Sequence, residues 1–215
     1  MGLRFAVALV LAGCASSSDG FRPSEWSDPF SVWGHPWQTR VGGPTGPGNN
    51  RWMRAEVSEE SIVLRVDDRS TEITTPLPPP PVEVVVELEG DLHTLDPSVV
   101  LGVFLYRNDT SEVDFEVTRW GDPDADNAQV VIAPARPERM WRFPLEVSER
   151  TLVRFRWRAR TIEVEVEQDG VRRRWRRASS LEPALHRLHL NLWRRTPADT
   201  PAEVRVTNVA IRRLR

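Results

Sequence analysis

Residues 161–175 read TIEVEVEQDGVRRRW, and this stretch decides the fold class. Across residues 162–167 three apolar side chains alternate with three glutamates. A period of two is typical of a strand with one buried face. Asp169-Gly170 then favours a two-residue hairpin turn, so Val171–Trp175 is expected to return as the next strand.

The same period recurs along most of the chain, in short segments separated by loops rich in Gly, Pro and Asp. A helical period of 3.6 residues is not convincing in any segment. Many short strands at this spacing predict an all-β sandwich or barrel, and 215 residues suit one such domain. The further expected strands are Ser61–Val66, Val82–Leu88, Val99–Tyr106, Glu112–Val117, Gln129–Ala133, Thr151–Trp157, Leu188–Trp193 and Val204–Ile211.

The charge and the cysteine count exclude several classes of function. The formal net charge is −2, which gives no general electrostatic reason to bind nucleic acid. Cys14 is the single cysteine, so a disulfide within the chain is excluded. The four histidines are scattered, and His186 and His189 lack acidic partners at metal-ligand spacing. We therefore expect no metal, no cofactor and no nucleic-acid partner.

The N-terminus predicts the compartment. Residues 1–4 make a short basic start, and residues 5–11 are apolar but far shorter than the ~20 residues of a membrane-spanning helix. This pattern fits a secretory signal peptide. The ending Leu11-Ala12-Gly13-Cys14 resembles the lipobox of bacterial lipoproteins. The alternative is an ordinary signal peptide with an incidental cysteine.

The lipobox resemblance implies cleavage before Cys14 and acylation of that residue. The chain then divides into a signal peptide at 1–13, a lipidated cysteine with a flexible tether at 14–27, and a sandwich domain at 28–215. Because no Asp follows Cys14, the resemblance also implies the outer membrane of a bacterial envelope. We expect contact with the membrane through this lipid anchor alone, and a monomer.

The segment Glu112-Val113-Asp114-Phe115-Glu116-Val117 is the strongest candidate site. Alternation along a strand places Glu112, Asp114 and Glu116 on one face. Mutual repulsion raises the pKa of at least one carboxyl group in such a row. Retaining glycoside hydrolysis needs one ionised and one protonated carboxyl group, ~5–5.5 Å apart. The Cα atoms of Glu112 and Glu116 lie ~13 Å apart along a strand, so their side chains must lean together.

The alternation of acidic and apolar residues does not by itself establish a catalytic site. Glu163, Glu165 and Glu167 show the same pattern with arginines beside them, and they are most simply a solvated face. The basic run Arg172–Arg177 is expected to be an exposed loop that these glutamates balance.

Glu-Val-Asp-Phe-Glu resembles the Glu-x-Asp-x-Glu signature of glycoside hydrolase family 16. Further segments share the resemblance, which is specific over Val99 to Pro134 and looser elsewhere. These segments are Val100–Tyr106, Thr118–Gly121, Asn127–Pro134, Phe155–Trp157 with Asp169-Gly170, and His189–Trp193.

The family resemblance implies a concanavalin A-like jelly roll of two antiparallel sheets. It also implies a retaining hydrolase or transglycosylase acting on β-linked glucans or galactans. Glu112 would be the nucleophile, Glu116 the acid/base, and Asp114 the residue that orients Glu112. Trp120 would be a stacking platform for the polysaccharide. Glu72 and Trp193 are the further substrate-binding candidates.

The chain also departs from the family pattern. The segment Ser70–Leu77 carries Glu72 but lacks the aromatic residues usual before the motif, and the strand Asn127–Pro134 lacks the histidine of many members. Two alternatives therefore stay open. One is a lectin-like lipoprotein that binds polysaccharide without cleaving it, and the other is a structural envelope lipoprotein.

Overall fold

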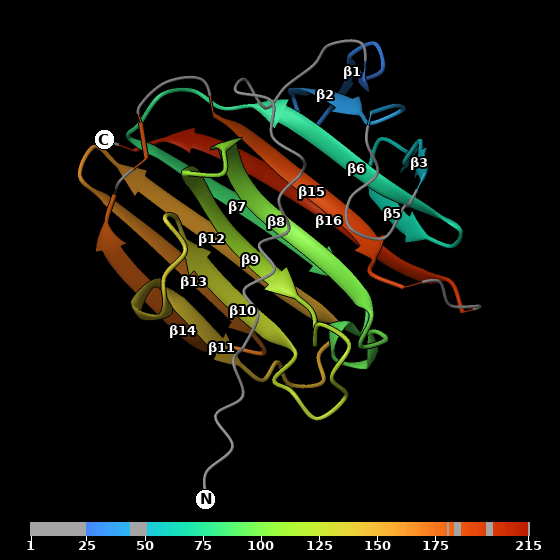
Figure 1. The fold of residues 1–215 in the computed structure, drawn as a ribbon. Helices are drawn as coiled ribbons and strands as arrows, with labels where there is room; N and C mark the ends of the chain where they lie inside the picture. The colour runs from blue at the N-terminus through green and yellow to red at the C-terminus, as the bar shows by residue number, and fades with distance from the viewer. Residues whose placement is uncertain (1–24, 44–50, 180, 183–185, 197–199, 215) are drawn as a thin grey trace, which may run out of the picture.

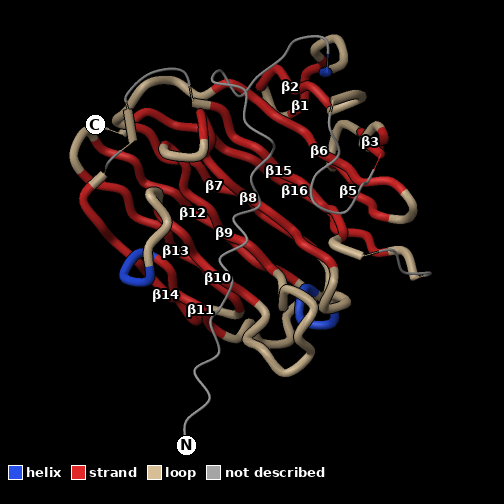
Figure 2. Tube along the Cα trace, viewed as in Figure 1, coloured by secondary structure: helices blue, strands red, loops and turns tan. Residues whose placement is uncertain are grey.

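The computed structural model describes residues 25–43, 51–179, 181–182, 186–196 and 200–214. The predicted signal peptide, Cys14 and most of the predicted tether lie outside the described residues. Within the described part, nearly all regular structure is β-strand (Figure 2). No helix there is long and apolar enough to span a bilayer.

The strands form two sheets that pack face to face (Figure 1). Neighbouring strands are antiparallel, except that β3 pairs with β6 in parallel. The nine-stranded sheet has the order β1 (Phe30–Val32), β2 (His35–Thr39), β6 (Arg69–Pro76), β15 (Arg187–Arg194), β8 (Val99–Asn108), β9 (Ser111–Val117), β10 (Ala128–Ile132) and β11 (Met140–Phe143), with β3 (Arg51–Met53) beside β6. The predicted all-β sandwich of two antiparallel sheets is confirmed.

The second sheet has seven strands. Its order is β14 (Val171–Ala178), β13 (Thr161–Gln168), β12 (Arg150–Arg158), β7 (Val82–Glu89), β16 (Ala202–Arg213), β5 (Ile62–Val66) and β4 (Glu56–Val57). The Asp169-Gly170 turn joins β13 to β14, and both turn residues have positive φ, 47° and 81°. This is the backbone that a type I′ hairpin turn requires.

The apolar core fills the space between the sheets. Val113, Phe115 and Val117 of β9 point into it and are almost fully buried, together with Phe155 and Trp157 of β12. Because side chains alternate along a strand, the carboxylates of β9 must point away from the core. Packing of the hydrophobic face thus fixes the face on which the acidic residues lie.

The basic run forms strand β14. The strand predicted at Val171–Trp175 is therefore confirmed, and the expectation of an exposed loop at Arg172–Arg177 is wrong. Alternation along β14 gives the arginines two roles. Arg172 and Arg174 bond Glu167 and Glu165 on the outer face. Arg173 and Arg177 point to the other side and stack on Phe143 and Trp141 of β11.

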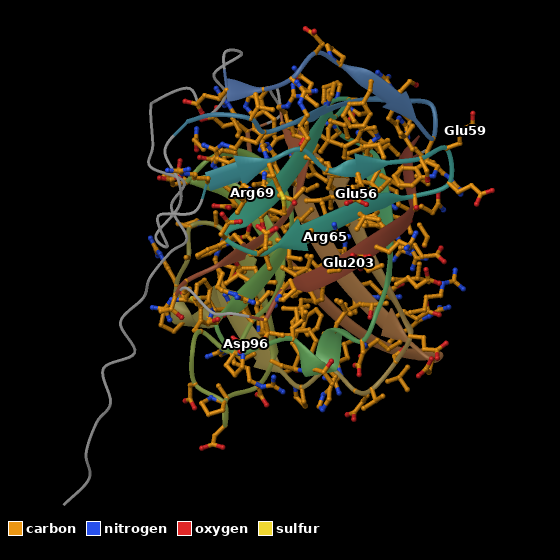
Figure 3. All side chains as sticks on the ribbon, turned by 90° about the vertical axis from the view of Figure 1, so that its right-hand side faces the viewer. Glu56, Glu59, Arg65, Arg69, Asp96 and Glu203 are labelled. Atoms are coloured by element: carbon orange, nitrogen blue, oxygen red, sulfur yellow. The ribbon has the colours of Figure 1, made fainter. Side chains whose placement is uncertain are left out.

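Ion pairs also run along the opposite end of the seven-stranded sheet. Arg65 on β5 lies between Glu56 and Glu203, with both nitrogen-to-oxygen distances at 2.7 Å (Figure 3). The outer face of this sheet is therefore patterned by charge, whereas its inner face is apolar except at the edge strand β14.

Candidate active site

Strand β9 lies between β8 and β10 in the nine-stranded sheet (Figure 1). Its pairing with β8 is unbroken from Glu112, opposite Tyr106, to Val117, opposite Leu101. Its pairing with β10 is unbroken from Val113 to Val117. Without a bulge in this span, Glu112, Asp114 and Glu116 share one face of the strand, as predicted.

The environment of Glu112 and Glu116 favours the protonated forms of their carboxyl groups. Burial, together with the negative charges of Glu116 and Asp109, raises the pKa of Glu112 to about 7 against the opposing effect of a hydrogen bond with Asp114. Burial also raises the pKa of Glu116 to about 7, against a hydrogen bond from Gln129 and the charge of Arg142. Near neutral pH one of the two carboxyl groups can therefore be protonated while the other is ionised, which is the division that retaining glycoside hydrolysis uses.

The strand beside Glu116 has a glycine whose missing side chain lets neighbouring side chains come close to the backbone. Gly102 of β8 lies directly opposite Glu116. A Cβ atom at Gly102 would lie 2.6 Å from Asn191 Oδ1 and 3.3 Å from the ring of Phe104. A side chain at Gly102 would therefore force Asn191, and to a smaller extent Phe104, to shift beside Glu116.

Two side chains connect Glu116 to the loop after β9. Gln129 of β10 lies opposite Glu116, and its Nε2 donates to Glu116 Oε2. Trp120 Nε1 donates to Gln129 Oε1 at 3.3 Å. Trp120 is half-buried, with Arg195 over its ring at 5.6 Å and Trp193 edge-on at 6.3 Å.

Glu72 of β6 lies on the same face of the sheet but is only 1% exposed. Its Oε2 accepts from Arg40 at 2.8 Å, and its Oε1 lies 2.9 Å from His189 Nδ1. Burial pushes the pKa of Glu72 upward, but the contacts with His189 and Arg40 outweigh it, so the pKa lies below its ordinary value. Since ionised Glu72 can only accept, His189 carries its proton on Nδ1.

Aromatic rings surround His189. Phe104 stacks on the imidazole at 5.1 Å, while Tyr106 and Trp26 meet it edge-on, each at 5.7 Å. The guanidinium of Arg40 lies over Trp52 at 4.7 Å. The aromatic side chains around Glu72, His189 and Arg40 thus come from other segments than Ser70–Leu77.

The structure brings the predicted residues together on one face of the nine-stranded sheet. Glu112, Asp114 and Glu116 form the centre, and Trp120 is joined to it through Gln129. Trp193 is 5% exposed and contacts Trp120, while Glu72 is held by Arg40 and His189. Sugar contacts of Trp120, Trp193 and Glu72 stay predictions.

Sequence reasoning missed Gln129, Asn191, His189 and Arg40. Asn191 and His189 alternate with leucines on β15, so the period of two could have placed them beside Trp193. Arg40 carries no such signal, because its contact with Glu72 joins two residues that are 32 positions apart in the chain. Among the residues that the structure describes, no cluster of His, Cys, Asp and Glu is arranged to hold a metal ion.

Neither a protein-family model nor a curated protein sequence matches this chain. Solved structures do: a prokaryotic β-1,3-1,4-glucanase (lichenase) from a mouse hindgut metagenome superposes with a TM-score of 0.64 and 15% identity, covering 90% of this chain and 96% of the other. A glycoside hydrolase family 16 endo-glucanase from Bacteroides ovatus gives 0.60 and 8%, covering 81% and 94%.

A third similar structure is described as a pseudo β-1,3-glucanase of Mycobacterium tuberculosis. It gives a TM-score of 0.61 at 13% identity, covering 81% of this chain and 90% of the other. At these identities the likeness establishes the fold. The chain has the jelly roll of the family 16 glucanases, and the implied concanavalin A-like architecture is confirmed.

Proposed function

We propose that the protein is a retaining glycosidase or transglycosylase of the family 16 type that acts on β-linked glucans or galactans. The observation that carries the proposal is the acidic row of β9. Glu112 and Glu116 flank Asp114 on an unbroken strand, and burial raises the pKa of both glutamates to about 7. The jelly roll of the glucanases supports the same conclusion.

We assign the roles as the family 16 resemblance implies. Glu112, which forms a hydrogen bond with Asp114, is the nucleophile, and Glu116 is the acid/base. The Glu112 carboxylate attacks the sugar C1 while Glu116 protonates the glycosidic oxygen, and the C1–O bond breaks. The result is a glycosyl–enzyme ester on Glu112 and a free alcohol. Glu116 then takes a proton from water or from an acceptor hydroxyl, which attacks C1 and releases Glu112.

The test is release of reducing ends from a panel of β-1,3-, mixed-linkage and sulfated glucans and galactans. We expect the purified protein to cleave at least one of them, and Glu112→Gln to reduce the rate at least about 10³-fold. Glu163→Gln is the matched control, because Glu163 belongs to the same residue pattern on the other sheet. Equal activity of the wild type and Glu112→Gln would contradict the proposal.

A second candidate is binding of polysaccharide without cleavage. It is favoured by the buried ion pairs of Glu72 and by the neighbour described as a pseudo-glucanase. In the same panel, co-sedimentation of the folded protein with an insoluble glycan without release of reducing ends would select this candidate.

We further propose that Cys14 is acylated and anchors the protein to the bacterial envelope, at the outer membrane. The lipobox-like ending at residues 11–14 supports this. Attached acyl chains would be found by mass spectrometry of the N-terminal peptide from the native membrane fraction. Cys14→Ser should lack them and leave that fraction, and an unmodified Cys14 in the wild type would refute the anchor.

A further inference from the structure

Gln129 lies between Glu116 and the loop that carries Trp120. The Gln129 side chain is only 5% exposed, and both ends of its amide are engaged. Nε2 donates to Glu116 Oε2, and Oε1 accepts from Trp120 Nε1 at 3.3 Å. The three side chains therefore form a continuous hydrogen-bond relay that ends on one oxygen of Glu116.

The indole of Trp120 fixes the direction of this relay. An indole nitrogen can only donate, so the group of Gln129 that faces Trp120 must be the carbonyl oxygen. The NH₂ group must then face Glu116. A flipped amide would place two donors against each other at Trp120, and an oxygen against the carboxylate of Glu116.

The loop holds Trp120 in an uncommon conformation. Its φ of 55° lies in the left-handed region, which is unusual for a bulky side chain and often marks a functional site. The Trp120 amide donates to Thr118 Oγ1 at 3.0 Å, and the Trp120 carbonyl accepts from Arg195 Nη1. The next residue, Gly121, donates to the Pro97 carbonyl at 2.7 Å.

We propose that Trp120 and Gln129 are positioning residues that keep the catalytic proton of Glu116 on Oε1. Oε2 faces a donor and must act as an acceptor, so a protonated Glu116 carries its hydrogen on the other oxygen. That oxygen is then the one that delivers the proton to the leaving group. The inference rests on the proposed function, in which Glu116 is the acid/base.

The relay also stabilises the ionised form of Glu116. Charged groups reach Glu116 from two strands: Asp114 and Glu112 on β9, and Arg142 on β11 opposite Gln129. The residues that β8 and β15 present beside it, Gly102 and Asn191, are neutral. Loss of the Gln129 donor should therefore raise the pKa of Glu116.

The experiment is a ¹³C NMR titration of the glutamate carboxyl carbons in the full-length protein, with Glu116 assigned from Glu116→Gln. Gln129→Met removes the donor at nearly equal volume. Trp120→Phe keeps an aromatic ring but lets the amide flip. Both should raise the pKa of Glu116 by about one unit. The control is Trp141→Phe, which removes an indole from the core side of β11 and should leave the pKa of Glu116 in place.

The basic limb of the pH profile of kcat/KM should move upward with the pKa of Glu116 in both variants, with kcat falling more than KM changes. An unmoved titration in both folded variants overturns the relay, even if the wild type cleaves glycans. A raised titration in variants of a protein that cleaves no glycan supports the relay and defeats the proposed function. Should Trp120→Phe fail to fold, Gln129→Met decides alone.

Discussion

Strands β9 and β13 have the same local sequence pattern and opposite electrostatics. Each carries three carboxylates that alternate with apolar residues. On β13, Glu165 is bonded by Arg154, Arg156 and Arg174 from the two neighbouring strands. Burial pushes the pKa of Glu165 upward, but these arginines outweigh it, so the pKa lies below its ordinary value.

On β9 the neighbouring strands present other side chains to the carboxylates. Gly102 and Phe104 of β8 and Gln129 of β10 lie opposite Glu116 and Asp114. The free-energy cost of burying a charged carboxylate is therefore poorly compensated, and the pKa of Glu116 rises to about 7. A row of carboxylates therefore becomes a candidate for acid–base chemistry through its neighbours across the sheet.

The largest expected effect on stability separates the two strands. Glu165→Gln leaves three arginines around a neutral amide at a site where the glutamate is 1% exposed. We expect the free energy of unfolding to fall by about 2–3 kcal/mol. Glu112→Gln should instead keep or raise it at pH 7.5, because a poorly compensated buried charge is removed. Urea unfolding measures both.

The control is Glu167→Gln on the same strand. Glu167 bonds Arg172 at 2.8 Å, and the Arg172 side chain is largely exposed. The free energy of unfolding should therefore fall by no more than about 1 kcal/mol. If Glu165→Gln proved no more harmful than Glu167→Gln, the ion pairs of β13 would not account for its stability, and the comparison would fail.

The sequence was sufficient to predict strands β8, β9 and β12–β14, since apolar alternation and the Asp169-Gly170 turn are local signals. It was insufficient for β6. The segment Ser70–Thr75 is polar except for Ile73, yet all of these residues are buried. Their burial depends on pairing with β15 and β2, which no local pattern reveals.

The candidate site divides in the same way. The carboxylates of β9 follow from one strand and its period. The contacts that surround them bring together residues from several strands and one loop: Gln129 is 13 residues from Glu116, and His189 is 117 residues from Glu72. Such contacts depend on sheet order and register, which hydrophobic patterning of a single sequence does not fix.

The smaller expected effect is the pH dependence of the free energy of unfolding. The pKa of Glu112 is raised from 4.5 to about 7 on folding, so between these values the folded protein binds more protons than the unfolded chain. The free energy of unfolding must therefore decrease as pH rises from about 4.5 to 7 through this group. The pKa of Glu165 is lowered, so its contribution is lost as pH falls below the ordinary glutamate range.

Urea unfolding at a series of pH values between 3 and 8 resolves the two contributions. Glu112→Gln should reduce the decrease in the free energy of unfolding between pH 5 and 8 by about 2 kcal/mol. Glu165→Gln should leave that decrease in place and reduce the loss at acid pH. Glu163→Gln should keep the decrease between pH 5 and 8, because it leaves β9 intact. If the decrease persisted unchanged in Glu112→Gln, the cost of charging Glu112 in the folded protein would be compensated by its surroundings. The carboxylates of β9 and β13 would then not differ in their electrostatics.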